Sequence, residues 1–195
     1  DGTDGIRITD RAISAEDPAL VFHPPVLALG IGCERGVDAT EVMDLVEKTL
    51  ADADLAPGAV ACVVSVDVKA DEAALHAVAA HLAVPTRFFS PARLEAETPR
   101  LANSSDIVFA EVGCHGVAEG AALAAVGGDG VLAVEKQKSK RATCAIGRSI
   151  APLDPIEIGE KRGCLSVVGI GPGSPAWRVP AATKVLAAAD EVVGY

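Results

Sequence analysis

A continuous apolar run at residues 26–32, VLALGIG, constrains the fold most, because a strand without polar positions has to be buried on both faces. A second such run, AVACVVSV, fills residues 59–66. Each run is followed by a segment with helical spacing of apolar residues, beginning near Asp38 and Asp71. With a third strand expected at 84–89, this alternation predicts an α/β domain, a three-layer α/β/α sandwich with a mainly parallel or mixed sheet.

The second half of this domain continues the pattern less regularly. Residues 103–112 fit a helix and a strand equally well, whereas an Ala-rich helix is clear at 117–126. Short apolar runs at 131–134 and 143–146 predict a hairpin. Between them lies the densest basic run of the chain, KQKSKR at residues 136–141, which we expect at the hairpin tip.

Pro and Gly residues divide the chain into four parts. We expect an arm at 1–25, the α/β domain at 26–149, a linker at 150–162 and a truncated α/β fragment at 163–195. The fragment should contain a strand at 164–170, a helix at about 180–189 and the start of another strand at 191–194. A segment of about thirty residues with one helix cannot bury an adequate core alone.

Composition excludes several classes of function. The formal net charge is −10 and aromatic residues make up only 3%, which argues against binding nucleic acid by phosphate contacts or base stacking. No apolar run approaches the roughly 20 residues needed to span a bilayer, and the N-terminus does not resemble a signal peptide, so we expect a cytoplasmic protein without a membrane partner. The five cysteines have no C-x-x-C spacing, so we expect reduced thiols and no metal site.

The loop after the first strand is a candidate binding site. Its candidate residues are Gly30, Gly32, Cys33, Arg35 and Gly36. Glycines let a ligand approach the backbone, and the N-terminus of the following helix favours an anion. The spacing is not that of the dinucleotide fingerprint. The alternative is an ordinary tight turn between strand and helix.

Three lysines are further candidates for binding an acidic ligand. Lys69 follows the second strand, where open α/β sheets bind ligands, and Lys136 and Lys138 belong to the basic run. Lysine ammonium groups hold carboxylates through charge-assisted hydrogen bonds. The alternatives are a solvated loop for Lys69 and a solvated hairpin tip for the other two.

The catalytic residue is not identified by the sequence, which offers three candidates. Cys114 and His115 lie between two glycines and could form a nucleophile and base, although an ordinary turn is the favoured interpretation because sequence neighbours point in different directions. Glu119 is the candidate polar group on the helix that follows.

Five segments in order carry a family resemblance over residues 26–148: LALGIGCERG, VDVKADEAAL, PTRFFSPARL, GVAEGAALAA and LAVEKQKSKRATCAIG. They resemble the C-terminal domain of CbiG and the free-standing CobE, and residues 1–25 resemble the end of the preceding CbiG region. The resemblance implies cobalamin biosynthesis, a corrinoid ligand, no cofactor in this domain and possible contacts with other corrin-pathway enzymes. It further implies that the parent protein hydrolyses the cobalt-precorrin-5A lactone with loss of acetaldehyde. A non-catalytic, CobE-like corrinoid-binding domain is the alternative.

A second resemblance covers residues 163–195. The run GCLSVVGIGPGSPAWRVPAATKVLAAADEVVGY resembles the opening of a tetrapyrrole methylase, in particular the precorrin-3B C-17 methyltransferase. This implies S-adenosylmethionine for a full-length methylase only, and a parent that is bifunctional; the fragment alone should not methylate. The residues that would contact that cofactor in an intact methylase are Gly169, Gly171, Pro172 and Gly173.

Overall fold

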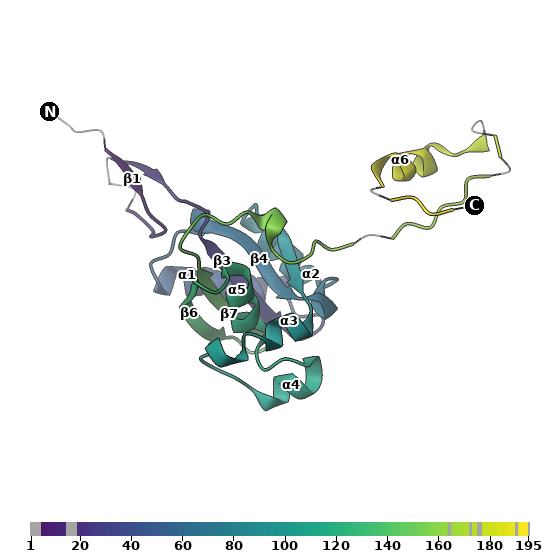
Figure 1. Cartoon of the computed structure of the whole chain (residues 1–195). Helices are drawn as coiled ribbons and strands as arrows, with labels where there is room; N and C mark the ends of the chain where they lie inside the picture. Colours follow the sequence, from purple (N-terminus) through teal and green to yellow (C-terminus); the bar gives the residue numbers. More distant parts are fainter. Residues whose placement is uncertain are drawn as a thin grey trace. The chain divides into compact units, whose positions relative to one another are not determined.

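The computed structural model describes most of the chain (Figure 1). The described residues are 5–14, 19–163, 165–171, 173–174, 177–189 and 191–194. The chain divides into two compact units, residues 1–162 and 163–195. The first unit contains the sheet and the helices that cover it.

A five-stranded sheet forms the centre of the first unit, in the order β5-β4-β3-β7-β6. Strands β3, β4 and β5 run parallel, β7 pairs antiparallel with β3, and β6 pairs antiparallel with β7. The sheet is therefore mixed, and β6 points in the same direction as β3. The strands are β3 (Leu27–Cys33), β4 (Val60–Val66), β5 (Thr86–Phe89), β6 (Val131–Lys138) and β7 (Ala142–Arg148).

Helices cover both faces of this sheet, and the two faces hold separate hydrophobic clusters. Leu27, Leu29 and Ile31 of β3 pack with α1 (Ala39–Asp52) and α2 (Ala73–His81). The intervening Ala28 belongs to the cluster on the other face, which contains α5 (Val117–Val126) and Leu94 of α3 (Pro91–Glu95). Because successive residues of a strand point to opposite faces, the apolar runs supply both layers. The predicted α/β sandwich with a mixed sheet is confirmed.

Helix α5 lies unusually close to the sheet because glycines face it. A Cβ atom on Gly30 would come within 2.0 Å of the carbonyl oxygen of Ala118, and one on Gly147 within 2.7 Å of that of Ala122. Only glycine fits at such a close approach of backbone to backbone. Gly30 therefore serves the packing of α5 on β3.

The segment that fitted helix and strand equally well is helical. Helix α4 (Asp106–Val112) begins at Ser105, whose hydroxyl accepts the backbone N–H of Val108, and ends at Gly113 in the left-handed conformation (φ 79°). None of its residues is buried. Short 3₁₀ helices complete the unit at Pro57–Ala59, Asp67–Lys69, Thr98–Arg100 and Pro155–Glu157.

Only the second half of the basic run, residues 139–141, lies at the hairpin tip where the sequence predicts the whole run. Strand β6 extends to Lys138 and β7 starts at Ala142, so only residues 139–141 form the turn. Lys136 and Lys138 are strand residues, and Lys138 pairs with Thr143. Side chains two residues apart on a strand share a face, so the two lysines project together from the edge strand of the sheet.

The segments at either end of the domain differ from the expected arm and linker. Two short parallel strands, β1 (Ile6–Ile8) and β2 (Leu20–Phe22), form a small sheet of their own. The expected linker at 150–162 lies along β5, where Arg87 donates to the carbonyls of Ile158 and Gly159. Ile158 is buried there.

In the second unit, the structure shows helix α6 (Pro180–Ala188), close to the expected bounds. The strands expected at 164–170 and 191–194 do not appear among the described residues of those ranges. Leu165 and Val167 are each 92% exposed. A strand needs a neighbouring strand to satisfy its backbone groups, and these described residues have none.

Within the described part of the chain, no single helix is long and apolar enough to cross a membrane. Helices α4 and α5 meet that length and composition only when taken together, and the chain bends by 79° between them.

Candidate functional site

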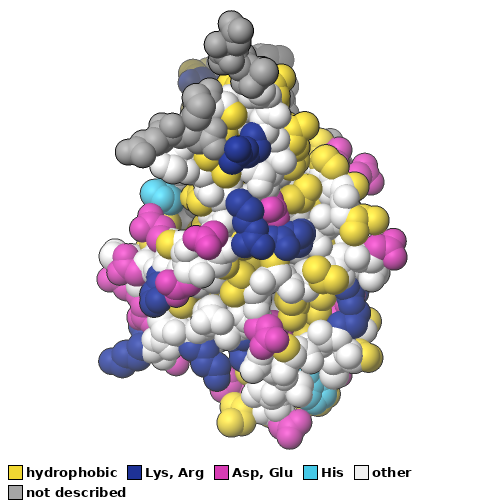
Figure 2. Space-filling view, turned by 90° about the vertical axis from the view of Figure 1, so that its left-hand side faces the viewer, with side chains coloured by type: hydrophobic (Ala, Val, Ile, Leu, Met, Phe, Trp, Pro, Cys, Tyr) yellow, Lys and Arg dark blue, Asp and Glu magenta, His cyan; other side chains and the backbone are white. Residues whose placement is uncertain are grey.

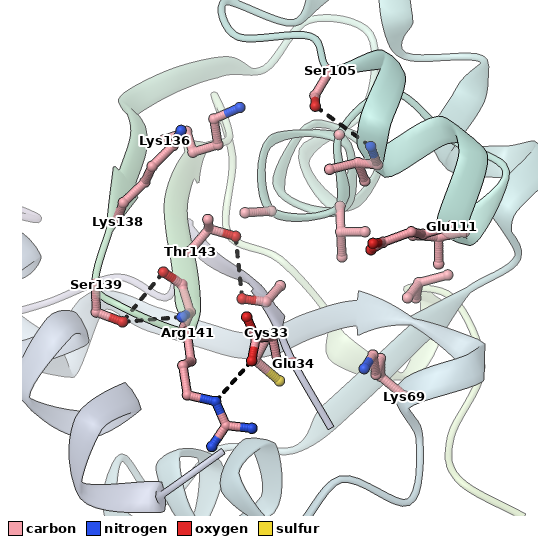
Figure 3. A pocket seen from close by; sticks show the side chains of 18 of the residues that line it. Cys33, Glu34, Lys69, Ser105, Glu111, Lys136, Lys138, Ser139, Arg141 and Thr143 are labelled. Carbon is pink, nitrogen blue, oxygen red and sulfur yellow. Dashed lines mark hydrogen bonds and ion pairs between the residues drawn. The ribbon is translucent and has the colours of Figure 1, made fainter. Parts of the chain in front are cut away.

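A cavity of about 730 Å³ opens at the edge of the sheet where β3, β4 and β6 end (Figure 3). Its walls are the loop after β3, the 3₁₀ turn after β4, the β6–β7 hairpin, helix α4 and the first turn of α5. Open α/β sheets bind ligands at the carboxyl ends of their strands, next to a change in strand order. Here that change lies at β3, whose neighbours are parallel β4 on one side and antiparallel β7 on the other.

The cavity combines a basic rim with an apolar wall. Two acidic residues, Glu34 and Glu111, also line it. The basic residues that line it are Arg35, Lys69, Lys136, Lys138, Lys140 and Arg141. The apolar side chains are Val66, Val68, Val108, Val112 and Val117. Small-molecule sites of roughly 300–1,000 Å³ typically have this mixture of apolar walls and a few polar groups. The excess of cations favours an anionic ligand.

The two arginines hold the cavity wall together. Arg141 donates from Nε to Glu34 (2.8 Å) and from a terminal nitrogen to the carbonyl of Arg35 (3.0 Å). Arg35 pairs with Asp71 (2.9 Å) and donates to the carbonyl of Val68 (2.6 Å). The hydrogen bond from Arg35 lowers the pKa of Asp71. These contacts tie the loop after β3 to the hairpin and to the turn after β4.

Three lysines remain available to a ligand. Within the described residues, the ammonium groups of Lys69, Lys138 and Lys140 make no hydrogen bond or ion pair with the protein. They come from two different walls, the turn after β4 and the hairpin. A ligand with more than one carboxylate would therefore meet cations from both sides.

Lys136 is a cavity lysine that is held by its neighbours. Its Nζ donates to the carbonyl of Asn103 (2.6 Å), and its backbone N–H donates to Glu119 (2.9 Å). Burial lowers the pKa of Lys136, and the charge of Lys138 adds to that lowering while Glu119 opposes it. Figure 3 shows Lys136 and Lys138 side by side on β6.

Glu119 does not line the cavity, although the sequence suggested it as a catalytic group. It is 1% exposed and accepts the backbone N–H and the side-chain amide of Asn103, each at 2.9 Å, as well as the N–H of Lys136. Burial alone would raise the pKa of Glu119, but these hydrogen bonds outweigh it and lower the pKa. Glu119 is thus an ionised carboxylate that positions β6 and residue 103.

The glycine loop supplies part of the cavity wall. Gly32 and Cys33 line it, whereas Gly36 is exposed outside the lining, has the left-handed conformation (φ 64°) and donates its N–H to Glu72 (3.0 Å). Burial and the nearby Glu72 raise the pKa of the Cys33 thiol to about 11. Cys33 is therefore a neutral thiol at physiological pH, unsuited to nucleophilic attack.

Cys114 and His115 lie outside the cavity. Cys114 is fully buried, and burial raises the pKa of its thiol. Both the backbone N–H and the Nδ1 of His115 contact Glu95 (2.9 Å), and the imidazole stacks on Phe109 with 4.5 Å between ring centroids. No hydrogen bond joins Cys114 to His115, both of which the structure describes, so it does not pair them as nucleophile and base.

The structure thus brings together six of the residues that the sequence suggested for binding: Gly32, Cys33, Arg35, Lys69, Lys136 and Lys138. Gly30 and Gly36 lie outside the cavity lining. Gly169, Gly171 and Gly173 belong to the second unit, and Pro172 lies outside the described residues.

Helix α4 contributes residues that sequence reasoning missed, namely Ser105, Val108, Glu111 and Val112. Their spacing of three or four residues is that of one helix face, but residues 103–112 fit a strand equally well, so the sequence did not identify this face. In the described part of the chain, no group of three or more His, Cys, Asp or Glu residues is arranged to hold a metal ion.

The face of the molecule in Figure 2 carries charges of both signs. On the face that Figure 2 shows, Lys and Arg side chains lie in small groups among acidic and hydrophobic ones. That face offers no continuous basic surface of the kind that nucleic-acid binding requires.

Comparison with known proteins places residues 27–147 in the family described as "Cobalamin synthesis G C-terminus". The chain is 55% identical over 120 residues to "Protein CobE" from Sinorhizobium sp, which covers 62% of this chain and 78% of that protein. It is 32% identical over 152 residues to a "Cobalt-precorrin-5A hydrolase" from Priestia megaterium, covering 75% of this chain but only 39% of that protein.

A solved structure agrees with these sequence matches. The crystal structure of CobE, titled as a protein from the cobalamin (vitamin B12) biosynthetic pathway, superposes with a TM-score of 0.61 and 36% identity, covering 64% of this chain and 91% of that one. The family match ends at residue 147, so the methylase resemblance of residues 163–195 stays a prediction.

Proposed function

Since this chain belongs to the cobalamin synthesis G C-terminal family and takes part in cobalamin biosynthesis, we propose that its basic cavity binds a corrinoid intermediate, cobalt-precorrin-5A, for hydrolysis of the lactone. The observation that supports this most is the set of three lysines without protein partners among the described residues, on two walls of one cavity. A corrinoid carries several carboxylates around an apolar ring. The cavity offers ammonium groups and a valine-rich wall in a matching arrangement.

The proposed hydrolysis has two steps. Water adds to the lactone carbonyl, the bond from that carbon to the ring oxygen breaks, and the products are a free hydroxyl and a carboxylic acid, which releases its proton to solvent and becomes a carboxylate. The hydroxyl then loses its proton, the bond between its carbon and the macrocycle breaks, and acetaldehyde leaves while the electron pair passes to the macrocycle. The first step needs a group that accepts a proton and donors that stabilise the oxyanion.

The cavity contains donors that suit the oxyanion. Gly116, which caps α5, and Val117 and Ala118 of its first turn line the cavity, and the N-terminus of a helix carries N–H groups without intrahelical partners and a partial positive charge. The lysines next to it add full positive charges. Together they would stabilise negative charge that develops on a bound carbonyl.

A second candidate is a corrinoid-holding domain that does no chemistry and presents the ligand to another enzyme. The fact that the chain spans only 39% of the hydrolase it matches favours this alternative. A further proposal, resting on the methylase resemblance alone, is that residues 163–195 open a methyltransferase domain in a bifunctional parent. S-adenosylmethionine would then bind only the complete methylase.

The experiment that tests the main proposal is titration of the purified chain with cobalt-precorrin-5A, followed by absorbance, with an assay for released acetaldehyde. Saturable binding with release supports a hydrolase. Binding without release supports the corrinoid-holding alternative and overturns catalysis by this chain. Absence of binding overturns the assignment of the cavity.

A further inference from the structure

Almost every carboxylate in or beside the cavity has a protein partner. These are committed to N–H, hydroxyl or guanidinium donors: Glu34, Glu41, Glu72 and Glu119. Glu111 differs, because its carboxylate makes no hydrogen bond or ion pair with any other residue that the structure describes. It is therefore the lining carboxylate that is available to a bound molecule.

The position of Glu111 on α4 directs it into the cavity. Ser105, Val108, Glu111 and Val112 all line the cavity, and residues three or four apart share one face of a helix. Figure 3 shows the Glu111 carboxylate pointing from α4 into the space between the hairpin and the loop after β3. Val108 and Val112 flank it with apolar surface, so a ligand that fills the cavity would exclude water around this group.

Other groups that could accept a proton at neutral pH are unsuited to it. None of the lining residues is a histidine, and the nearby His115 is engaged by Glu95 outside the cavity. Cys33 holds its proton, because burial raises its thiol pKa to about 11. Lys136 donates an N–H of Nζ to the carbonyl of Asn103. Of the two carboxylates that line the cavity, Glu34 is paired with Arg141, so Glu111 is the candidate base.

We propose that Glu111 is the general base of the lactone-opening step, an inference that rests on the hydrolysis proposed above. Its carboxylate takes one proton from the attacking water while the water oxygen bonds to the lactone carbonyl carbon. When the tetrahedral intermediate collapses, the bond to the ring oxygen breaks and Glu111 returns the proton to that oxygen. The carboxylate is then regenerated, and no further reactant is needed.

The charge of Glu111 also lets its role in catalysis be separated from a role in binding. Its negative charge opposes the binding of an acidic ligand, so replacing it with neutral glutamine should not weaken binding. A catalytic role and a binding role therefore predict different outcomes. Loss of a general base typically lowers the rate by about 10²–10⁴-fold.

The test compares Glu111→Gln with wild type in single-turnover release of acetaldehyde from saturating cobalt-precorrin-5A, with Kd measured by absorbance titration. We expect the rate to fall by about 100-fold or more while Kd stays the same or decreases. Glu111→Ala should be equally slow and should recover partly in sodium formate, which supplies a diffusible carboxylate. The matched control is Glu135→Gln, an exposed carboxylate on β6 outside this cavity, which should leave the rate unchanged.

Two results would overturn this assignment while leaving the hydrolysis intact: a wild-type rate in Glu111→Gln, or a loss of rate explained wholly by a loss of affinity. Absence of acetaldehyde release by the wild-type chain would overturn both the hydrolysis and the role of Glu111.

Discussion

The carboxylate of Glu119 on α5 accepts the backbone N–H of Lys136 on β6 at 2.9 Å. The same carboxylate receives two hydrogen bonds from Asn103, whose carbonyl in turn accepts the Lys136 ammonium. One buried acid thus fixes the strand and the loop that border the cavity on this side. A residue outside the lining controls the position of one inside it.

Replacing Glu119 with glutamine should lower stability. Its three hydrogen bonds come from N–H donors, and a glutamine amide group would face at least one of them, leaving a buried donor unsatisfied. We expect a loss of about 1–3 kcal/mol in the free energy of unfolding, measured by urea denaturation. Glu135→Gln on the exposed side of β6 is the matched control and should change stability by less than about 0.5 kcal/mol. Equal stability of the two variants would contradict the structural role of Glu119.

Because the Glu119 carboxylate is ionised in the folded state, we expect the free energy of unfolding to depend on pH in the acidic range. The hydrogen bonds lower the pKa of Glu119 in the folded state below its ordinary value of 4.5, so the unfolded chain takes up the proton first as pH falls. Its contribution is complete above pH 4.5 and is lost as pH falls through the lowered pKa. Hydrogen bonds also lower the pKa of Glu41 and of Glu95, so the stability that these two carboxylates contribute is likewise lost as pH falls.

We therefore expect the difference in unfolding free energy between wild type and Glu119→Gln to shrink when urea denaturation is repeated at successively lower pH below 4.5. A difference that stays constant throughout acidification would show that Glu119 is not preferentially ionised in the folded state.

Gly30 should not tolerate even the smallest side chain. A Cβ atom there would lie 2.0 Å from the Ala118 carbonyl oxygen, so α5 would have to move away from the sheet. Gly30→Ala should lower the free energy of unfolding by about 1–3 kcal/mol or more. In Gly128→Ala the added atom meets nothing within 4 Å, and we expect a change below about 0.5 kcal/mol. Thermal denaturation of both variants checks this, and equal melting temperatures would refute the close packing of α5.

Lys138 should contribute to the binding of a corrinoid without contributing to the fold. It is exposed and has no protein partner in the described part of the chain. We expect Lys138→Ala to raise the Kd for cobalt-precorrin-5A by about tenfold, equivalent to ~1.4 kcal/mol, and to reduce the dependence of binding on salt. The control is Lys48→Ala, which removes a lysine paired with Asp52 on α1. An unchanged Kd in Lys138→Ala would remove this lysine from the site.

The sequence was informative where a single element determines its own structure. The apolar run of β3 has to be buried on both faces, and the position of Lys69 just after β4 follows from the end of that strand. For the basic run, by contrast, the predicted hairpin tip is right for residues 139–141 and wrong for residues 136–138. Strand ends depend on pairing with a partner, and β6 extends to Lys138 because β7 continues opposite it.

Residues whose roles depend on long-range contacts could not be predicted. The sequence around Glu119 does not indicate that its carboxylate accepts the N–H of Lys136. The sequence around Arg141 likewise does not indicate a hydrogen bond to Glu34, which lies 107 residues earlier in the chain. Helix α4 has no buried residue, so its periodicity was weak and the direction of Glu111 was hidden. The sequence suggested Gly30 as a ligand-binding residue. A glycine that allows a helix to pack closely and a glycine that allows a ligand to approach look the same in the sequence.

The central claim is that a corrinoid binds in the cavity between the hairpin and the turn after β4. Lysine footprinting tests it most directly: the chain is acetylated with and without saturating cobalt-precorrin-5A, and the extent of modification is read by mass spectrometry. We predict that Lys69, Lys138 and Lys140 are protected while Lys48 on α1 is not. Equal modification of the three cavity lysines with and without the corrinoid would contradict the claim.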